Sequence, residues 1–507
     1  MRQLTNIKAF IFLAFVSVLV LFFVSTDSYL HDVFDKGDSA WFFICGKSWM
    51  KGMVPYVDFA DSKGPLLWLI YGVGYLLSHY NYVGVFWITC FFYALTLFVS
   101  YKTADIFLKN PIKSMFAALL MLLAYFNPPC FAEVRCEDFA HLPMAISLYS
   151  ACQILYGNGK RIFLLAALLG ISFAAVLLMK FNIAIMQSSF LLAAFYGVVR
   201  NQTGLWHFFA GVSIGVVVLL LPFLAYFLYV GCFSDFIQEY FLNTFITTKS
   251  INPLGNTAKV LIRPACWLSF VMGFLSTLLA AGMLKRHRWF PLLAFLFVFV
   301  LSAVNARDYY FVINAVFMLF CPVWFLNHLN TRFKSKILSI IAGGVIVSFC
   351  IAENLVHDLR HPDTGDLFFQ DNMMRRNFYK YAYLLVQIPQ PRIVSIYGWN
   401  PLDANCEALP ACKYWSLQWG ATHSMIEEMK VSIRNRAADA VLISKGQINN
   451  YRQLLKDCGY FEYDYGNEEN DCILFSKHSL KEPPQDFHVT NWDILTKRRI
   501  VYGGYQD

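Results

Sequence analysis

The chain has 507 residues, of which 58% are hydrophobic, 18% aromatic and only 15% charged. A soluble chain is typically about half apolar and about a quarter charged, and single soluble cores stop growing at roughly 250–300 residues. The length excludes a small disulfide-stabilised secreted scaffold, and the low charge excludes a disordered chain. The composition therefore predicts a polytopic α-helical membrane protein.

The charge is divided unequally along the chain. Residues 1–352 carry 24 Lys and Arg against 13 Asp and Glu, whereas residues 353–507 carry 17 against 20. Basic loops of a membrane protein face anionic lipid or fix the topology. No basic run is typical of nucleic-acid binding, so the expected partner is membrane lipid and no nucleic acid. We predict a membrane domain over 1–352 and a soluble domain over 353–507.

Eleven apolar runs are predicted to cross the membrane, because a crossing helix needs about 20 mostly apolar residues. The first run follows Arg2 and Lys8 and precedes no small-residue cleavage site, so we expect an uncleaved anchor. A shorter run, 65–79, opens with Gly64-Pro65 and is expected to lie at the surface or to enter only halfway. The predicted crossings are 9–24, 82–106, 112–127, 140–156, 161–178, 181–199, 206–230, 266–284, 289–304, 309–326 and 336–352.

The basic loops predict the orientation. With the N-terminus in the cytoplasm, all five basic loops lie inside, provided that 65–79 does not cross. Residues 353–507 then lie outside, in the periplasm if the membrane is a bacterial inner membrane. Of the acids before residue 353, Asp105 lies inside, and twelve lie outside: Asp27, Asp32, Asp35, Asp38, Asp58, Asp61, Glu133, Glu137, Asp138, Asp235, Glu239 and Asp308. This asymmetry indicates either long solvated loops or an outward-facing site that uses carboxylates.

The first outer loop, 26–64, contains a predicted interfacial helix at Ser39–Met50. A helix there places Trp41, Phe42, Cys45 and Trp49 on one face, with Lys47 and Lys51 off it. Asp38 stands at the helix start, where a carboxylate can serve simply as a cap. Asp61 and Lys63 precede Gly64-Pro65 and can likewise be only a polar hinge before the next helix.

The stretch GDSAWFFICGKSWMKGMVPYVDFADSKGPL resembles the first outer loop of the bacterial C-type (GT-C) glycosyltransferases. These are the glycosyltransferase family 39 and protein-mannosyltransferase-like enzymes, which include the lipid A aminoarabinose transferases. Ser39 replaces the family's Glu, and Gly64 replaces its first Pro. The matching positions are Asp38, Val54-Pro55-Tyr56, Asp61, Lys63 and Pro65-Leu66.

The resemblance implies roles for the first-loop residues. Asp38 would be the catalytic base or a stabilising carboxylate. Lys63, beside Asp61, would contact the lipid-linked phosphate, and a cation there suits a leaving group that gains negative charge. The family's second functional carboxylate matches Glu137 and Asp138 by position in the loop 127–143, for which the alternative is a solvated turn.

Later parts of the chain add further candidates. Lys180 lies where the family often carries a lysine that faces the donor phosphate, although a lysine at that depth can also reach the surface alone. Arg307, with Tyr309 and Tyr310, is similar to the family's basic-x-His-Tyr-Phe motif, Tyr309 standing where His is usual. Arg307 would bind phosphate. The alternative is an Arg–Asp pair at a helix end with interfacial tyrosines.

A metal site is left open by the sequence. Carboxylates from two loops can hold a divalent cation, and Asp38, Asp61, Glu137 and Asp138 are the candidates. No His/Cys spacing here is typical of zinc, and no other cofactor is expected.

The soluble domain is predicted to be α/β. Strands are expected at 393–397, 440–444 and 472–475, and helices at 423–436 and 449–457. It contains no glycine-rich phosphate loop and no Ser/His/Asp signature. In an oxidising compartment its cysteines can pair as 406–412 or 458–472, and Cys130 can pair with Cys136, but sequence does not give the connectivity.

The expected function is transfer of a sugar from a polyprenyl-phosphate donor to a lipid, glycan or protein acceptor at the periplasmic face. A single displacement would invert the anomeric centre, because no nucleophile for a double displacement is evident. The main alternative is a multi-span transporter or lipid flippase, although no internal repeat of the kind common in transporters is visible. A second alternative is a non-enzymatic assembly or polysaccharide-polymerising partner.

Overall fold

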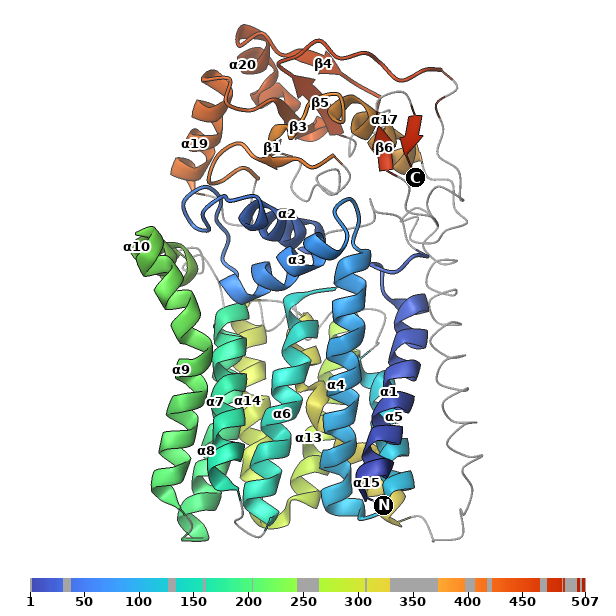
Figure 1. Ribbon diagram of the computed structural model, residues 1–507, viewed down its shortest axis with the longest axis vertical. Coiled ribbons are helices and arrows are strands. Elements are labelled where there is room, and N and C mark those ends of the chain that lie inside the picture. Colours follow the sequence, from blue (N-terminus) through green and yellow to red (C-terminus); the bar gives the residue numbers. More distant parts are fainter. Residues whose placement is uncertain are drawn as a thin grey trace. The chain divides into compact units, whose positions relative to one another are not determined.

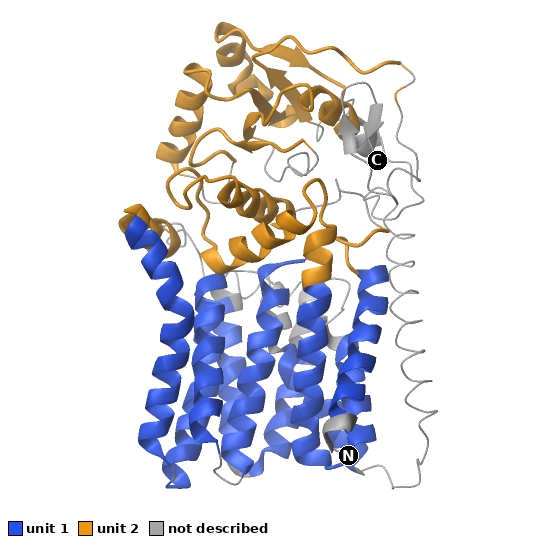
Figure 2. Cartoon of the chain, viewed as in Figure 1, with its two compact units in different colours: residues 1–24, 89–229, 248–354 blue, residues 25–88, 230–247, 355–507 orange. Residues whose placement is uncertain are grey.

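A computed structural model describes the protein. It divides into two compact units, coloured separately in Figure 2. Unit 1 comprises residues 1–24, 89–229 and 248–354, and unit 2 comprises 25–88, 230–247 and 355–507. The residues that the structure describes are 2–30, 38–125, 134–157, 161–202, 204–243, 264–305, 308–328, 373–396, 406–416, 422–465, 472–485, 487, 499–501 and 504–506.

Unit 1 is a set of long apolar helices (Figure 1). Helix α6 packs against α7 and α8, and α13 packs against α14 and the 3₁₀ helix η3. The helices that contribute to unit 1 are α1 (Arg2–Val24), α4 (Val83–Leu108), α5 (Pro111–Tyr125), α6 (Cys136–Tyr156), α7 (Ile162–Met179), α8 (Ile183–Arg200), α9 (Leu205–Val230), α13 (Pro264–Met283), η2 (Lys285–His287), α14 (Trp289–Asn305), η3 (Asp308–Leu319) and α15 (Phe320–His328).

These helices follow the predicted crossings. Among the described residues, five helices are long and apolar enough to cross a membrane: 6–24, 83–108, 162–179, 183–200 and 205–230. The other predicted runs up to residue 326 are also helical, and 336–352 lies outside the described residues. Val218, Leu221 and Leu228 on α9 are more than half exposed, as side chains that face lipid would be. The predicted polytopic helical fold is confirmed.

Two short helices of unit 2 follow α1 in the chain. Helix α2 (Asp38–Met50) confirms the predicted helix at 39–50, and α3 (Pro65–Leu77) begins at the predicted proline. At 13 residues, α3 spans only about 20 Å, too short to cross a bilayer. Lys47, which was predicted to lie off the apolar face of an interfacial helix, is fully buried. Helix α2 is buried along nearly its whole length, so it has no purely polar face.

The C-terminal part of unit 2 contains a five-stranded mixed sheet in the order β2-β1-β3-β5-β4. Strand β1 pairs in parallel with β2 and β3, whereas β5 pairs antiparallel with β3 and β4. The elements are α17 (Met373–Leu385), β1 (Arg392–Ile396), β2 (Leu409–Pro410), α19 (His423–Arg434), β3 (Ala440–Ser444), η5 (Lys445–Asn450), α20 (Arg452–Asp457), β4 (Phe461–Tyr463) and β5 (Cys472–Ser476), with a separate hairpin of β6 (Arg499–Val501) and β7 (Gly504–Gln506). The short outer segment of unit 2 contains α10 (Phe233–Phe236) and the π-helix η1 (Ile237–Leu242).

The sheet confirms the predicted α/β character. Strands β1, β3 and β5 and helix α19 lie within two residues of their predicted bounds. Their apolar faces meet in one core that includes Val394, Ile433, Val441 and Phe475. The cysteines at 406, 412, 458 and 472 are free thiols in this structure, as is Cys136, and Cys130 lies outside the described residues.

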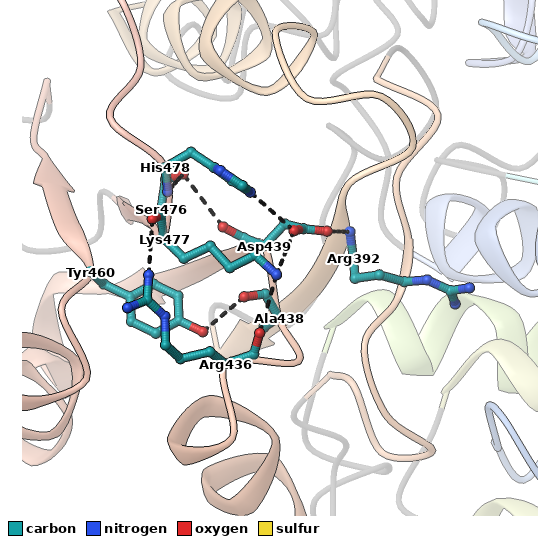
Figure 3. Close-up of polar contacts among 8 residues, drawn as sticks. All are labelled: Arg392, Arg436, Ala438, Asp439, Tyr460, Ser476, Lys477 and His478. Carbon is teal, nitrogen blue, oxygen red and sulfur yellow. Dashed lines mark hydrogen bonds and ion pairs between the residues drawn. The ribbon is translucent and has the colours of Figure 1, made fainter.

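One carboxylate joins the ends of three strands of this sheet (Figure 3). Asp439 precedes β3, and its Oδ2 accepts the backbone N–H of Arg392 at 2.7 Å. Its Oδ1 lies 2.8 Å from Nζ of Lys477 and 3.2 Å from Nε2 of His478, both just after β5. Burial favours the neutral acid, but the hydrogen bonds from Lys477, Arg392 and His478 outweigh it and lower the pKa of Asp439. The ionised carboxylate therefore stabilises the end of the sheet at which β1, β3 and β5 meet.

We expect Asp439→Asn to lower the stability of this end of the sheet in a pH-dependent way. A group whose pKa is lowered by folding contributes stability above its unfolded pKa of about 4, and that contribution is lost as the pH falls through the folded pKa. Hydrogen exchange of the β1 and β3 amides should show a loss of about 1–3 kcal/mol in opening free energy at pH 7. The difference from wild type should shrink below about pH 4. The exposed Asp457→Asn is the control, and an equal loss at pH 3 and pH 7 would contradict the charge argument.

Candidate functional site

The α2–α3 pair sets the geometry of the first outer loop. The helices cross at Gly46 and Gly72, where a Cβ on Gly46 would lie 2.7 Å from the carbonyl oxygen of Trp68 and overlap the backbone of Gly72. Only glycine permits so close an approach. Edge-to-face contacts of Phe42 with Tyr71, and of Phe43 with Tyr75, fill the rest of the interface. The crossing therefore holds the start of α2 and the start of α3 in fixed positions.

Asp38 is the first residue of α2. Its side chain is half-buried, and its carboxylate has no hydrogen-bond or ion-pair partner among the described residues. The first turn of a helix stabilises a negative charge through its free N–H groups. A side chain at this position can therefore interact favourably with the helix N-terminus when it is ionised.

Lys63 stands at the start of α3, with its ammonium over the ring of Phe42 at 5.6 Å from the centroid. Phe42 lies four residues after Asp38, so the two share one face of α2. Asp61 lies 3.9 Å from the Lys63 ammonium and also accepts the backbone N–H of Ser62 at 2.5 Å. Asp61 and Lys63 therefore lie together, and Lys63 contacts Phe42, one helical turn after Asp38 on α2.

Tyr56 joins this loop to the outer segment that contains η1. Its hydroxyl donates to the carbonyl of Lys63 at 3.0 Å, and its ring packs against Phe236 and Tyr240. Its φ of 68° is uncommon for a residue other than glycine and is typical of a site under constraint. Burial, with nearby Tyr240 and Asp61, raises the pKa of Tyr56 well above its usual value, so the hydroxyl stays a donor. Tyr56 was matched as part of a motif, but it was not predicted as a site residue.

A second set of predicted residues lies in unit 1. Glu137, in the first turn of α6, forms an ion pair of 2.5 Å with Lys180, the residue that ends α7. Both side chains are more than nine-tenths buried. The sequence predicted the two residues separately, and the structure makes them partners. Lys180 therefore does not reach the surface alone, and its charge is matched within the protein.

Asp138 is engaged in the fold of α6. Its Oδ2 accepts the backbone N–H of Arg135 at 2.8 Å, which closes the N-terminus of the helix. Its Oδ1 accepts the hydroxyl of Tyr93 at 2.9 Å, and that hydroxyl also lies 3.2 Å from Nδ1 of His141. This network orients the first turn of α6, next to Glu137.

The structure does not describe the side chains of the remaining predicted site residues. Arg307 lies outside the described residues, and the side chains of Tyr309 and Tyr310, in η3, are likewise not described. In the described ranges no three His, Cys, Asp or Glu side chains gather as a metal site would require.

The structure adds residues of the C-terminal domain that sequence reasoning missed. Glu407 accepts from Lys51 at 3.0 Å and from the hydroxyl of Tyr75 at 3.1 Å. Lys413 lies 2.7 Å from Glu239 of η1. Lys51 and Glu407 are 356 residues apart in the sequence, and no local sequence pattern predicts such a contact.

We expect Glu137 and Lys180 to stabilise unit 1 only when both charges are present. Lys180→Met leaves a buried carboxylate without its cation, which costs about 3–5 kcal/mol. The double variant with Glu137→Gln should recover much of that loss. Thermal unfolding of the purified protein in detergent measures both, and Lys113→Met, which removes only a donor to the Leu326 carbonyl, should cost less. A double variant as unstable as Lys180→Met would argue against charge pairing.

Comparison with solved structures identifies the fold. ArnT from Cupriavidus metallidurans bound to undecaprenyl phosphate matches with a TM-score of 0.63 at 12% identity, covering 94% of this chain and 99% of that chain. The same protein in the apo state gives 0.61 over the same shares. The oligosaccharyltransferase AglB from Archaeoglobus fulgidus, with an inhibitory peptide and a dolichol-phosphate, is a weaker likeness at 0.43 and 11% identity, covering 96% of this chain and 75% of that one.

No protein-family model matches the sequence, and no curated protein matches it closely enough to count as a relative. The structural match nevertheless extends over nearly the whole length of both chains. The chain therefore has the fold of the C-type glycosyltransferases.

Proposed function

We propose that the protein transfers a sugar from a polyprenyl-phosphate donor to an acceptor at the outer face of the membrane. The observation that carries the proposal is the placement of Asp38 and Lys63 on the α2–α3 pair, in a chain with the C-type glycosyltransferase fold. ArnT, which shares this fold, has been crystallised with undecaprenyl phosphate. A phosphate-linked lipid donor is the substrate class that fits a cation beside an open carboxylate.

Asp38 is the proposed general base. An acceptor hydroxyl attacks the anomeric carbon, its proton passes to the Asp38 carboxylate, and the bond from that carbon to the phosphate oxygen breaks. Among the described residues no other group occupies the acceptor positions of the Asp38 carboxylate, as a general base for the incoming hydroxyl requires. One displacement inverts the anomeric centre.

Lys63 is the proposed cation for the departing phosphate. The leaving group gains negative charge as the bond breaks, and an ammonium nearby stabilises that charge more in the transition state than in the ground state. Asp61 lies at the outer limit of an ion pair, 3.9 Å away, and its Oδ1 accepts from Ser62.

For the residues of unit 1 we propose supporting roles. Lys180 would supply a second cation for phosphate, with Glu137 holding it in place and Asp138 fixing the first turn of α6. Arg307, Tyr309 and Tyr310 would contact the donor, as the family motif implies. We further propose that the N-terminus is cytoplasmic, that the C-terminal domain is periplasmic, and that the acceptor is a lipid or glycan. A divalent cation at the carboxylates stays a prediction.

The direct test is incubation of the purified protein with polyprenyl-phosphate sugars, with measurement of free polyprenyl phosphate. Transfer is expected for wild type, and Asp38→Asn should lower the rate by about 10²–10⁴-fold because the amide cannot take the proton. Asn keeps the size of the side chain and a preference for helix starts, so the fold should persist.

Asp58→Asn is the matched control, since its side-chain oxygen still accepts the N–H of Val54 in the same loop. A wild-type rate for Asp38→Asn would make Asp38 only a part of the helix start. Movement of intact donor across vesicles without release of polyprenyl phosphate would instead identify a flippase.

Lys63 tests the phosphate contact separately. Lys63→Met keeps the apolar stem and loses the charge, which is worth roughly 1.5–3 kcal/mol in a charge-assisted contact. Turnover should fall further than donor affinity, and Lys63→Arg should keep part of the activity. Lys102→Met, a lysine that donates to Asn6 in unit 1, is the control. Normal turnover of Lys63→Met at saturating donor would exclude the phosphate role.

A further inference from the structure

Residues 406–416 of the C-terminal domain contact the first outer loop and the outer segment with η1 at several points. All of these contacts lie within unit 2. We infer that the 406–416 segment is a positioning part of the transferase site, with Glu407 and Lys413 as positioning residues that hold α2, α3 and η1 in register. The inference rests on the proposed function, but its structural part can be measured without activity.

The first contact is electrostatic and lies at the end of α2. Lys47 and Lys51 are four residues apart and so share one helix face. Burial favours the neutral form of Glu407, but the hydrogen bonds from Lys51 and Tyr75 and the charge of Lys47 outweigh it and lower the pKa of Glu407. Lys47 is fully buried, and a buried cation is costly unless a carboxylate matches it. Glu407 therefore links the 406–416 segment to the end of α2 through Lys51 and to α3 through Tyr75.

The second contact joins the segment to η1. Glu239 is 6% exposed, and its Oε1 lies 2.7 Å from the Lys413 ammonium and 2.8 Å from the hydroxyl of Tyr414. Its Oε2 accepts from Asn243 at 2.7 Å. The Lys413 ammonium also lies 3.7 Å from Asp235. A carboxylate with this many donors is held firmly, and π-helical turns such as η1 occur frequently at functional sites.

The third set of contacts borders the proposed catalytic residues directly. Trp415 lies against Trp41, with ring centroids 4.9 Å apart, and Trp41 is three residues after Asp38 on α2. The carbonyl of Lys413 accepts the backbone N–H of Ala60, the residue before Asp61, at 3.0 Å. The segment thus contacts the chain beside Asp38 and again beside Asp61 and Lys63. It fixes the distance between the base and the phosphate cation.

The segment also contributes β2 to the C-terminal sheet through its backbone, but the side-chain contacts of Glu407 and Lys413 with the outer loops are separate from that pairing. Neither Glu407 nor Lys413 belongs to the apolar core of that domain. Substitution of either residue should leave the sheet folded and remove only the contacts with the outer loops. This separation allows a positioning role to be distinguished from a general loss of structure.

The experiment compares Glu407→Gln and Lys413→Met with Glu427→Gln and Lys430→Met in the full-length protein. The control residues form an ion pair of 2.8 Å within α19, so the substitutions are chemically identical but do not reach the outer loops. Hydrogen exchange of 38–50 and 235–243 should accelerate about tenfold or more in the first two variants only. Exchange of β3 and β5 should be unchanged in all four.

The kinetics provide the second measurement. If the segment acts by positioning the loops and not by binding the donor, kcat should fall about tenfold or more while the donor KM stays within about twofold. Lys413→Arg, which keeps the cation, should recover most of kcat. An unchanged exchange rate at 38–50, or a raised KM with normal kcat, would overturn the inference. If wild type releases no polyprenyl phosphate, the proposed function fails, and the exchange data alone decide whether the segment holds the loop.

Discussion

Pairing of lysines with carboxylates is the interaction on which much of this structure depends. Apolar surroundings make an unpaired ion costly, and carboxylates lie beside the buried Lys180 at the end of α7 and beside the less buried Lys51 and Lys413. Glu407, Glu239 and Glu137 supply them. Each pair joins elements far apart in the sequence, so charge matching, together with the glycine crossing of α2 on α3, determines which segments meet.

Periodicity and composition predicted much of the fold. The apolar runs gave the long helices because a bilayer demands a fixed length of apolar chain, and Gly64-Pro65 marked the start of α3. Strands β1, β3 and β5 were evident because they are short, β-rich and fully buried. Strand β2, with only two residues, carries no such signal.

Site residues within a local motif, such as Asp38, Asp61 and Lys63, could be predicted from the sequence. The pairing of charged residues that lie far apart in the sequence could not. Lys180 and Glu137 each looked unusual alone, but their pairing depends on how α6 and α7 pack. Lys47 was placed off the apolar face because helical periodicity considers one helix alone, whereas its burial depends on the elements that pack against α2. Glu407 and Lys413 lie in an irregular segment with no pattern of their own.

The long separation between Lys51 and Glu407 has a consequence for biosynthesis. The first outer loop leaves the ribosome 356 residues before its partner. At roughly 5–20 residues per second, the loop waits on the order of 20–70 s for the segment that completes it. During that time the α2 lysines lack the Glu407 carboxylate. A chain that stops before residue 406 would carry the described apolar helices α1 to α15 and a first loop that lacks this carboxylate.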